Sequence, residues 1–506
     1  MSNIVGIDLG TTMSAIAALN SVGKPEIIPN KDGDRITPSV IFFESKNNVL
    51  IGEEAKNTAA TESKSVAKEF KREMHNANYR FNIHGNSYTA SDLSSLILKK
   101  LTQDASKQVG SIRDVVISVP AYFEENQRNA TIQAGQLAGL NVIAIINEPT
   151  AAALYYASTT DIKGKGLVYD LGGGTFDVTV TQTDGRDIQI IASSGDHHLG
   201  GVDFDQAMLE LIEEKYKAST NGKLYADEDG KHEFLLLAED IKKSLSSRNL
   251  VKQKLAGEDG KVTIEITQAE FEEKISTYIS RTELLVEQVL DEADYEAPDI
   301  DYTLLVGGSS RIPTIQKSIK KLMGKEPLVA INVDEAVALG AAIKAGLVLT
   351  KNNPSMVSST IANEMKTIKV GDVANHSYGA ITLSYNKNLG KYIDVNSIIL
   401  KKNTPLPATM SDTFYTTHEG QEIIAIKITQ GEDTDPDFVN KIDEIEINLP
   451  ANRPEGQPIE VKYSYDENQI MHCEVKDVNS GKVESKKINL SVDSSKKNTL
   501  DAFLVN

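Results

Sequence analysis

The residues of this chain that could do chemistry are concentrated in two segments with the same order of residue types. Ile4–Thr12 and Gly166–Asp177 each run from an apolar stretch into an aspartate, then glycine, then threonine. Glycine lets backbone N–H groups approach phosphate oxygens closely and turn toward them as an anion-binding nest. We therefore predict two strand–turn–strand clasps, on facing half-domains, that hold one polyphosphate between them.

Three aspartates belong to the predicted clasps: Asp8, Asp170 and Asp177. Carboxylates beside phosphate repel it unless a cation lies between them, so this set predicts Mg²⁺ held largely through water. Hydroxyl donors to the phosphates come from Thr11, Thr12 and Thr175. Either clasp alone could be a Gly-Asp hairpin without a ligand, but the pair favours the phosphate site. The sequence contains neither a P-loop nor a Rossmann fingerprint.

Length and charge narrow the class of protein. A chain of 506 residues is too long for one ordinary core, so two or more domains are expected. The net charge of -19 repels nucleic acid and anionic lipid, so we expect neither as a partner. No apolar run approaches the ~20 residues of a membrane helix, and the N-terminus lacks a secretory pattern. We expect a cytoplasmic protein, whose single cysteine, Cys473, excludes an intrachain disulfide.

The periodicity of the chain changes along its length and predicts four regions. Residues 1–350 alternate short apolar strands with helical stretches, which is typical of an α/β domain. The pattern loosens over 351–373, where we expect a linker. Residues 374–493 show period-2 strands separated by turn residues and predict an antiparallel sandwich. Residues 494–506 are expected to be a short frayed tail.

Further motifs give the chain a family resemblance. They are Asn147–Ala153 (Asn-Glu-Pro-Thr-Ala-Ala-Ala), Gly195–Gly201, Leu304–Pro313 and Asp334–Ala342, followed by Lys402–Pro407, Gln430–Glu432 and Asn479–Lys482. With these motifs in this order, the chain resembles the DnaK-type heat-shock chaperones of the seventy-kilodalton class. The resemblance implies an actin-like ATPase domain, with two lobes built on duplicated mixed sheets, and then an all-β antiparallel sandwich that binds peptide.

The resemblance also implies roles for individual residues in the cleft. The residues expected to hold a hydrated Mg²⁺ are Asp8 and Asp170, with K⁺ as a further candidate cation. The expected catalytic set is Lys71, which positions the γ-phosphate and the attacking water, Glu148 near that water, Thr175 at the γ-phosphate, and Asp177, which assists with cations or water. By pattern alone, Lys71 would be a surface lysine and Glu148 a helix cap.

ATP or ADP is the cofactor that the resemblance implies. The residues expected to bind it are Gly10, Thr11, Thr12, Gly172, Gly173, Gly174, Gly201, Glu239, Lys242, Lys243, Ser246, Gly307, Gly308, Ser309, Arg311 and Asp334. In this arrangement the base rests on the Gly307–Arg311 turn, and Arg311 stacks on the adenine. Glu239, Lys242, Lys243 and Ser246 share one helix face, which by pattern alone would be an ordinary solvated face.

In the β-domain the resemblance implies a site for an extended apolar peptide at Leu383, Phe414, Thr417, Ile424 and Ile426. For Phe414 and Ile426, burial in the sandwich core is an equally good interpretation of the pattern. Communication between the domains is expected at Pro120, Arg128 and Asp372. The implied partners are unfolded or extended apolar peptides, a J-domain co-chaperone and a nucleotide exchange factor.

The chain departs from the family pattern at several positions. Ile368–Asp372 carries a charge and a glycine where the family's linker is strongly apolar, so we expect weaker linker docking. Ala144 replaces the arginine that helps to receive a J-domain partner, and Glu124 replaces a usual asparagine. The sequence ends soon after the β-domain, without the helical lid, so we expect fast peptide exchange.

Three functions remain open on the sequence. The first is a Mg·ATP-driven peptide-binding chaperone, in which the nucleotide state changes the grip of the β-domain. The second is a non-hydrolysing regulatory or scaffold protein of the same fold. The third, an actin-like sugar kinase, is disfavoured by the β-domain.

Overall fold

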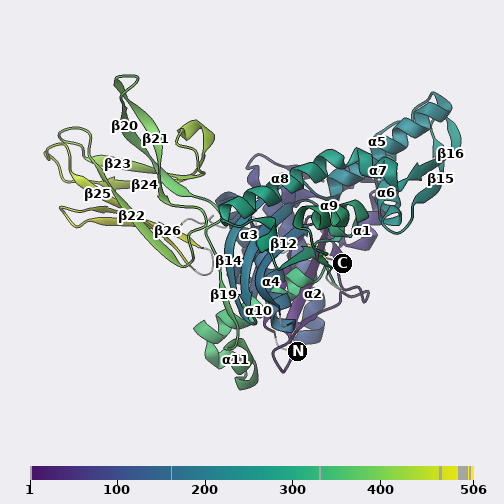
Figure 1. Ribbon diagram of the computed structural model, residues 1–506, viewed down its shortest axis with the longest axis horizontal. Helices are drawn as coiled ribbons and strands as arrows, with labels where there is room; N and C mark the ends of the chain where they lie inside the picture. Colours follow the sequence, from purple (N-terminus) through teal and green to yellow (C-terminus); the bar gives the residue numbers. More distant parts are fainter. Residues whose placement is uncertain are drawn as a thin grey trace.

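The computed structural model describes residues 3–160, 162–329, 332–466, 470–487, 500 and 503–505. Most of the predicted tail, including 494–499, therefore lies outside the described residues. The chain is a mixed α/β protein with several sheets, as expected (Figure 1).

Residues 5–371 contain two six-stranded sheets, and five strands of each sheet follow the same order. The first sheet runs β11 (Asn141–Asn147), β10 (Asp114–Val119), β1 (Val5–Asp8), β2 (Met13–Leu19) and β3 (Pro25–Ile27), and β4 (Thr37–Pro38) also pairs with β2. The second sheet runs β18 (Leu328–Val329), β17 (Tyr302–Val306), β12 (Lys163–Leu171), β13 (Phe176–Asp184), β14 (Asp187–Asp196) and β19 (Lys369–Gly371). In each sheet, three consecutive antiparallel strands are followed by two parallel ones. Each sheet defines one lobe, named here the first and the second lobe.

Two helices rich in small residues lie between the sheets. These are α4 (Glu148–Thr159) and α10 (Ala336–Asn352), and their apolar side chains share one core with strands of both sheets. A Cβ on Gly340 would lie 1.8 Å from the carbonyl oxygen of Ala151, so the two helices can approach this closely only with glycine there. The close contact of α4 and α10 fixes how the two clasps face each other.

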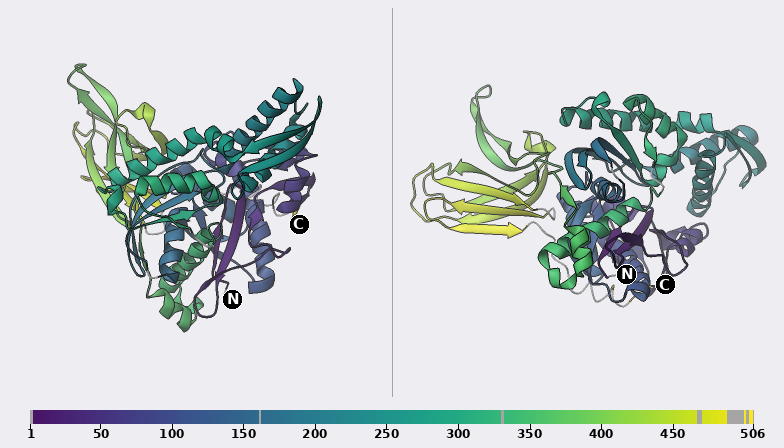
Figure 2. Two further views of the ribbon diagram at one scale, coloured as in Figure 1. Left: turned by 45° about the vertical axis from the view of Figure 1, so that its right-hand side comes forward. Right: turned by 60° about the horizontal axis from the view of Figure 1, so that its bottom comes forward.

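The outer faces of the two sheets are covered by further helices. The first lobe carries α2 (Ala90–Val109) and α3 (Glu125–Leu137), with α1 (Glu53–Thr58), β5 (Ile41–Ser45), β6 (Asn48–Ile51), β7 (Val66–Ala67) and the hairpin β8 (Phe81–Ile83) and β9 (Asn86–Tyr88). The second lobe carries α5 (Gly201–Thr220), α6 (Glu228–Leu245), β15 (Leu250–Gly257), β16 (Gly260–Thr267), α7 (Gln268–Lys274), α8 (Ser276–Glu292) and α9 (Pro313–Met323). The unit of α5 to α7 with β15 and β16 projects at the end opposite the β-sandwich (Figures 1 and 2).

The C-terminal part of the chain folds into two four-stranded antiparallel sheets with their own core. One sheet runs β21 (Lys391–Leu400), β20 (Tyr378–Asn386), β23 (Ile423–Gln430) and β24 (Asn440–Asn448). The other runs β22 (Ala408–Tyr415), β25 (Pro458–Tyr465), β26 (Met471–Asp477) and β27 (Val483–Lys487). Buried side chains alternate along β25 and β26, as expected for strands with one face in a core.

The segment predicted to be a loose linker contains regular structure. Helix α11 (Ser359–Met365) packs beside α10 with Ile361 and Met365 buried, and β19 adds a parallel edge strand to the second lobe through pairing with β14. The linker over 351–373 remains a prediction, and part of this segment forms regular structure against the second lobe. Ser358 caps α11 by accepting a hydrogen bond from the Ile361 N–H, a start signal that the Ser-Ser-Thr sequence contains.

For residues 503–505, the expectation of a frayed tail is wrong. Strand β28 (Leu504–Val505) pairs in parallel with β6, in the first lobe. No helix of the described residues combines the length and the apolar composition that crossing a membrane requires.

Candidate functional site

The cleft between the two sheets holds a cavity of about 470 Å³ lined by both lobes. Every residue predicted to bind nucleotide or metal lies on its wall, from Asp8 and Gly10 in the first lobe to Asp170 and Arg311 in the second. Three of the four predicted catalytic residues also line it, namely Lys71, Glu148 and Thr175. The cavity is therefore surrounded by segments that are far apart in the sequence, from Asp8 to Asp334.

The two predicted clasps lie directly against each other in this cleft. A Cβ on Gly173 would lie 2.1 Å from Thr12 Oγ1, and one on Gly174 would lie 2.5 Å from Thr11 Oγ1. Both distances are too short for real atoms, so these glycines are required by the contact between the clasps. The similarity between the two segments thus corresponds to a physical contact between the lobes.

Lys71 and Glu148 form a buried ion pair in the cleft. Lys71 lies in a 3₁₀ helix (Phe70–His75) of the first lobe and is 3% exposed, and its Nζ donates to Glu148 Oε1 at 2.8 Å. Glu148 is the first residue of α4, directly after β11. The loss of one partner would leave the other charged and buried, which is costly. Lys71 and Glu148 are therefore expected to stay paired, and both line the cavity.

The aspartates of the site are buried together. Burial and the charge of Glu148 raise the pKa of Asp8 to about 7, against the opposing effects of Lys71 and of the Ser118 hydroxyl that donates to Asp8. Burial, followed by the neighbouring carboxylates, also raises the pKa of Asp170. The pKa values rise mainly because the carboxyl groups are buried, and the one ammonium of Lys71 does not offset this burial together with the repulsion between the carboxylates.

This donor set suits a hard cation, because added positive charge would favour the ionised carboxylates. Among the described residues, however, no group of three or more His, Cys, Asp or Glu side chains is arranged to hold a metal ion. A cation bound largely through water remains the prediction for Asp8 and Asp170.

Asp177 does not line the cavity, unlike the other three predicted catalytic residues. Its Oδ1 accepts a hydrogen bond from the backbone N–H of Tyr122 at 3.1 Å, which joins β13 of the second lobe to the loop before α3 of the first. Burial and the charge of Glu148 raise the pKa of Asp177 to about 8. In this structure Asp177 connects the two lobes behind the cavity.

The predicted adenosine side of the cavity is built from the second lobe. Ser309 donates to the Gly172 carbonyl oxygen at 2.9 Å, which fixes the Gly307–Arg311 turn against the clasp. Arg311 pairs with Asp334 at 2.7 Å and remains about half exposed at the edge of the cavity. On α6, Lys242 pairs with Asp205 at 2.7 Å, so the predicted helix face is turned into the cavity rather than into solvent.

Several residues of the cleft carry no motif, and sequence reasoning missed them. Lys56 of α1 pairs with Glu239 of α6 at 2.6 Å and so joins the lobes. Burial alone would raise the pKa of Glu239, but hydrogen bonds from Lys243 and Lys56 hold it at about 2. Arg72 donates to the Gly174 carbonyl oxygen at 3.1 Å and pairs with Asp203 of α5. The position of Arg72 beside Lys71 was the only signal for it in the sequence.

The residues predicted to carry signals between the domains are connected to one another. The buried Arg128 donates to Asn147 Oδ1 at 2.7 Å, and Asn147 donates to the carboxylate of Asp372 at 3.3 Å. Thr150 donates to the same carboxylate at 3.3 Å. Pro120 is buried at the end of β10, in the loop that leads to Tyr122.

The β-sandwich touches the first lobe along α3 and the loop before it. The Glu125 N–H donates to Gln430 Oε1 at 3.0 Å, and the Tyr378 hydroxyl donates to Glu125 Oε2 at 3.2 Å. His376 Nε2 lies 3.2 Å from the Tyr122 carbonyl oxygen, and the two rings are 4.9 Å apart. Tyr122 therefore contacts both Asp177 and the start of the sandwich.

The residues predicted to bind peptide are divided between surface and core. Leu383 is 52% exposed and Thr417 is exposed, whereas Phe414 and Ile424 are half-buried against the sandwich core. Ile426 is 5% exposed and belongs to that core, so in this structure it offers no surface to a peptide. Between these alternatives, the structure favours the core for Ile426.

The sheet that carries these residues is open along one line. In the described residues, β20 and β23 pair only at Tyr378–Ala380. Beyond that point β20 continues its pairing with β21, and β23 with β24, so the two hairpins diverge (Figure 1). Strand edges that do not pair present N–H and C=O groups to another chain.

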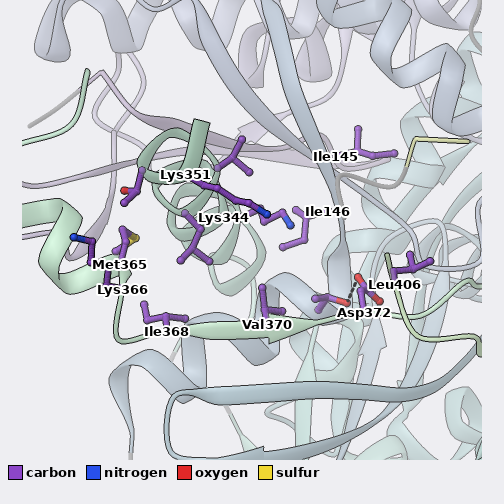
Figure 3. A pocket seen from close by; sticks show the side chains of 14 residues that line it. Ile145, Ile146, Lys344, Lys351, Met365, Lys366, Ile368, Val370, Asp372 and Leu406 are labelled. Carbon is purple, nitrogen blue, oxygen red and sulfur yellow. Dashed lines mark hydrogen bonds between the residues drawn. The ribbon is translucent and has the colours of Figure 1, made fainter. Parts of the chain in front are cut away.

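A second cavity, of about 370 Å³, lies beside the linker strand (Figure 3). Its wall includes Ile145 and Ile146 of β11, Ile368 and Val370 of the linker, and Leu406 of the sandwich. It adjoins Asp372 and therefore the connection from Arg128. This cavity is a separate space from the cleft between the lobes.

Comparison with known protein families gives one match over almost the whole length. A family model described as "Hsp70 protein" matches residues 4–503. The match includes both lobes, the linker and the sandwich.

Proposed function

The chain belongs to the Hsp70 family, and from this premise we propose that it is a chaperone that hydrolyses Mg·ATP in the cleft and thereby controls how the β-sandwich binds extended apolar peptides. The observation that carries the proposal is the buried Lys71–Glu148 pair in the wall of the cavity that the two clasps also line. A protein that used ATP only as a structural ligand would have no need of a buried ammonium beside carboxylates in this position.

The chain's own residues supply binding and orientation for hydrolysis. The backbone N–H groups of both clasps and the hydroxyls of Thr11, Thr12 and Thr175 bind the phosphates. The Lys71 ammonium offsets the negative charge that builds on the transferred phosphoryl group, and Glu148 orients the attacking water. Asp8 and Asp170 would hold a hydrated Mg²⁺, which neutralises phosphate charge when bound.

Closure of the lobes over the nucleotide gives the site its connection to the sandwich. The contacts that span the lobes include Lys56 to Glu239, Arg72 to Asp203, and Asp177 to Tyr122. Since Tyr122 also contacts His376, a change in the angle between the lobes moves the surface on which the sandwich rests. The link from Asp372 to Asn147 and Arg128 gives the linker a second route to the same surface.

The diverging edges of β20 and β23 are the proposed peptide site. An extended peptide would add main-chain hydrogen bonds to these edges, and apolar side chains would rest near Leu383, Phe414 and Ile424. A J-domain co-chaperone and a nucleotide exchange factor are the partners that this function implies. Ala144 stands where the family pattern has an arginine at the surface for the J-domain, so we propose that such a partner stimulates ATP hydrolysis only weakly.

Basal turnover of ATP by the full chain tests the proposal. Phosphate release should require Mg²⁺ and stop when a chelator removes it. Binding of ATP without any release of phosphate, with Mg²⁺ present, would contradict the proposal and favour a non-hydrolysing scaffold.

A further inference from the structure

The first lobe has a sheet edge that is occupied by a distant part of the same chain. Strand β6 forms a sheet with β5 and β7, and its outer edge pairs with β28 in parallel, with Leu504 opposite Asn48 and Val505 opposite Val49. The Leu504 N–H donates to the Asn47 carbonyl oxygen at 3.0 Å, and Lys99 Nζ donates to the Leu500 carbonyl oxygen at 3.2 Å. Polar groups of the first lobe thus hold the backbone of this segment at two points.

The side chains of the segment enter the core of the first lobe. Leu500, Phe503 and Val505 are at most 9% exposed and belong to the same core as β1 and α2, whereas Leu504 is 63% exposed. The ring of Phe503 meets the rings of Phe43 and Tyr88 edge-on, with centroids 6.0 Å away in both cases. Alternation of buried and exposed side chains along 503–505 is the pattern of a strand with one face on a core.

The position of this segment has a consequence for the whole chain. Strand β27 ends at Lys487 in the sandwich, and the docked segment begins at Leu500 in the first lobe. A connection of this length spans at most about 45 Å when fully extended. The chain therefore connects the sandwich to the ATPase lobes on both sides, through the linker before it and through the segment that docks at Leu500 and Phe503–Val505 after it. In Figures 1 and 2 the C-terminal end lies near α1, away from the sandwich.

We propose that the edge of β6, with the apolar socket around Phe43 and Tyr88, is a docking site for a short apolar strand, and that Leu500 and Phe503–Val505 of this chain are its occupant. This segment, named here the latch, limits how far the sandwich can move from the first lobe. Movement of the sandwich beyond the reach of this connection requires the latch to leave β6. The latch thereby supplements a linker whose sequence is less apolar than the family pattern.

The latch is also placed to respond to the nucleotide cleft. Strand β6 ends at Ile51 and α1 begins at Glu53, so the strand that holds the latch leads directly into the helix of Lys56. Lys56 pairs with Glu239 across the cleft and lines the cavity. Because coupling between two sites is reciprocal, closure of the cleft that steadies α1 should strengthen the latch, and the docked latch should favour closure.

Variants of the full chain without nucleotide test the latch. Phe503→Asp places a charge in the apolar socket, and Leu504→Pro removes the N–H that donates to Asn47. Leu504→Ala is the matched control, because the side chain of Leu504 is exposed and alanine keeps the N–H. The first readout is hydrogen exchange of β5 and β6, with β12 and β13 of the second lobe as an internal check of folding.

The second readout is energy transfer between dyes on cysteines introduced at Ser111 of the first lobe and Ser411 of the sandwich, both exposed positions. We expect Phe503→Asp and Leu504→Pro to speed exchange of the β6 amides roughly tenfold or more and to broaden and lengthen the dye separation. Leu504→Ala should leave both unchanged. Normal exchange and dye separation in both disruptive variants would overturn the proposal. Since no nucleotide is present, failure of ATP hydrolysis cannot produce either result.

Discussion

At the residue scale, the charge of one buried ammonium in the cleft opposes the charges of several carboxylates. The charge of Lys71 lowers the pKa of Asp8, Asp170 and Asp177, although burial and the charge of Glu148 raise all three by more. Lys71 therefore stabilises the carboxylate cluster, and in the proposed mechanism its ammonium also offsets the charge of the phosphates. Its removal should lower turnover per folded molecule, and it should lower stability as well because Glu148 would be left buried without its partner.

We expect Lys71→Ala to lower ATP turnover by at least about 10²-fold, because a positioned charge that stabilises the transition state is lost. Phosphate release under saturating Mg·ATP measures this. Lys100→Ala is the matched control: Lys100 is also a buried lysine, paired with Asp104 at 2.9 Å, but it lies outside the cavity. Lys100→Ala should keep turnover per folded molecule. Equal turnover in the Lys71 variant and the parent would disprove the assigned role.

Residue types alone predicted the two clasps, because phosphate binding demands glycine, threonine and aspartate. The rest of the predicted cavity wall, including Lys71, Glu148 and Arg311, was implied by the family resemblance. Lys56 and Arg72 could not be predicted in this way. Their roles come from contacts between lobes far apart in the sequence, and a lysine or arginine at such a contact has no characteristic neighbours. Asp177 shows the reverse: it belongs to a motif, yet it lies behind the cavity.

At the element scale, the contact between the clasps is set by backbone shape. We expect Gly173→Ala to lower the free energy of unfolding by about 1–3 kcal/mol, because the new methyl group would lie 2.1 Å from Thr12 Oγ1 and force the clasps apart. Gly172→Ala is the neighbouring control, since its Cβ would come no closer than 3.7 Å to the Thr175 carbonyl oxygen. Denaturant unfolding of the protein without nucleotide measures both. A Gly173 variant as stable as the Gly172 variant would show that the clasps are not in tight contact.

The strands and helices were predictable where apolar periodicity is strong. The apolar run over residues 114–119 is strand β10 along its whole length. Strands β22 and β27 are harder to predict, because most of their side chains are polar or exposed and alternation is weak. Strand β28 was missed for another reason: it consists of two residues, and only the edge of β6 makes it a strand.

At the scale of the whole molecule, the surface between the sandwich and α3 contains two buried titratable groups with opposite tendencies. Burial raises the pKa of Glu125 to about 7, against the opposing charge of Arg128. Burial lowers the pKa of His376 to about 3, with further lowering by the charge of Arg128. Glu125 therefore prefers to be protonated in the docked state, and His376 prefers to be neutral.

The sign of the pH effect follows from these directions. The contribution of Glu125 to docking is complete below its ordinary pKa and is lost as the pH rises through about 7. The contribution of His376 is complete above its ordinary pKa and is lost as the pH falls toward about 3. The two groups can be separated because only one of them changes in a Glu125 variant.

We expect Glu125→Gln to strengthen docking at pH 8 by about 1–3 kcal/mol and to have little effect at pH 4.5, because the amide cannot ionise. Energy transfer between the dyes at Ser111 and Ser411, followed in denaturant at both pH values, measures this difference. Glu124→Gln is the control: Glu124 accepts a hydrogen bond from Asn440 at the same surface and is half-buried. A Glu125 variant with the pH profile of the parent would contradict the assignment.

In the proposed function, the nucleotide in the cleft controls the affinity of the sandwich for peptide. The most direct test measures the affinity of the full-length Lys71→Ala variant, which should not hydrolyse ATP, for a fluorescent extended apolar peptide, first with Mg·ATP and then with Mg·ADP. We expect tighter binding and slower release with ADP than with ATP. Equal affinity and equal release rates in the two nucleotide states would contradict it.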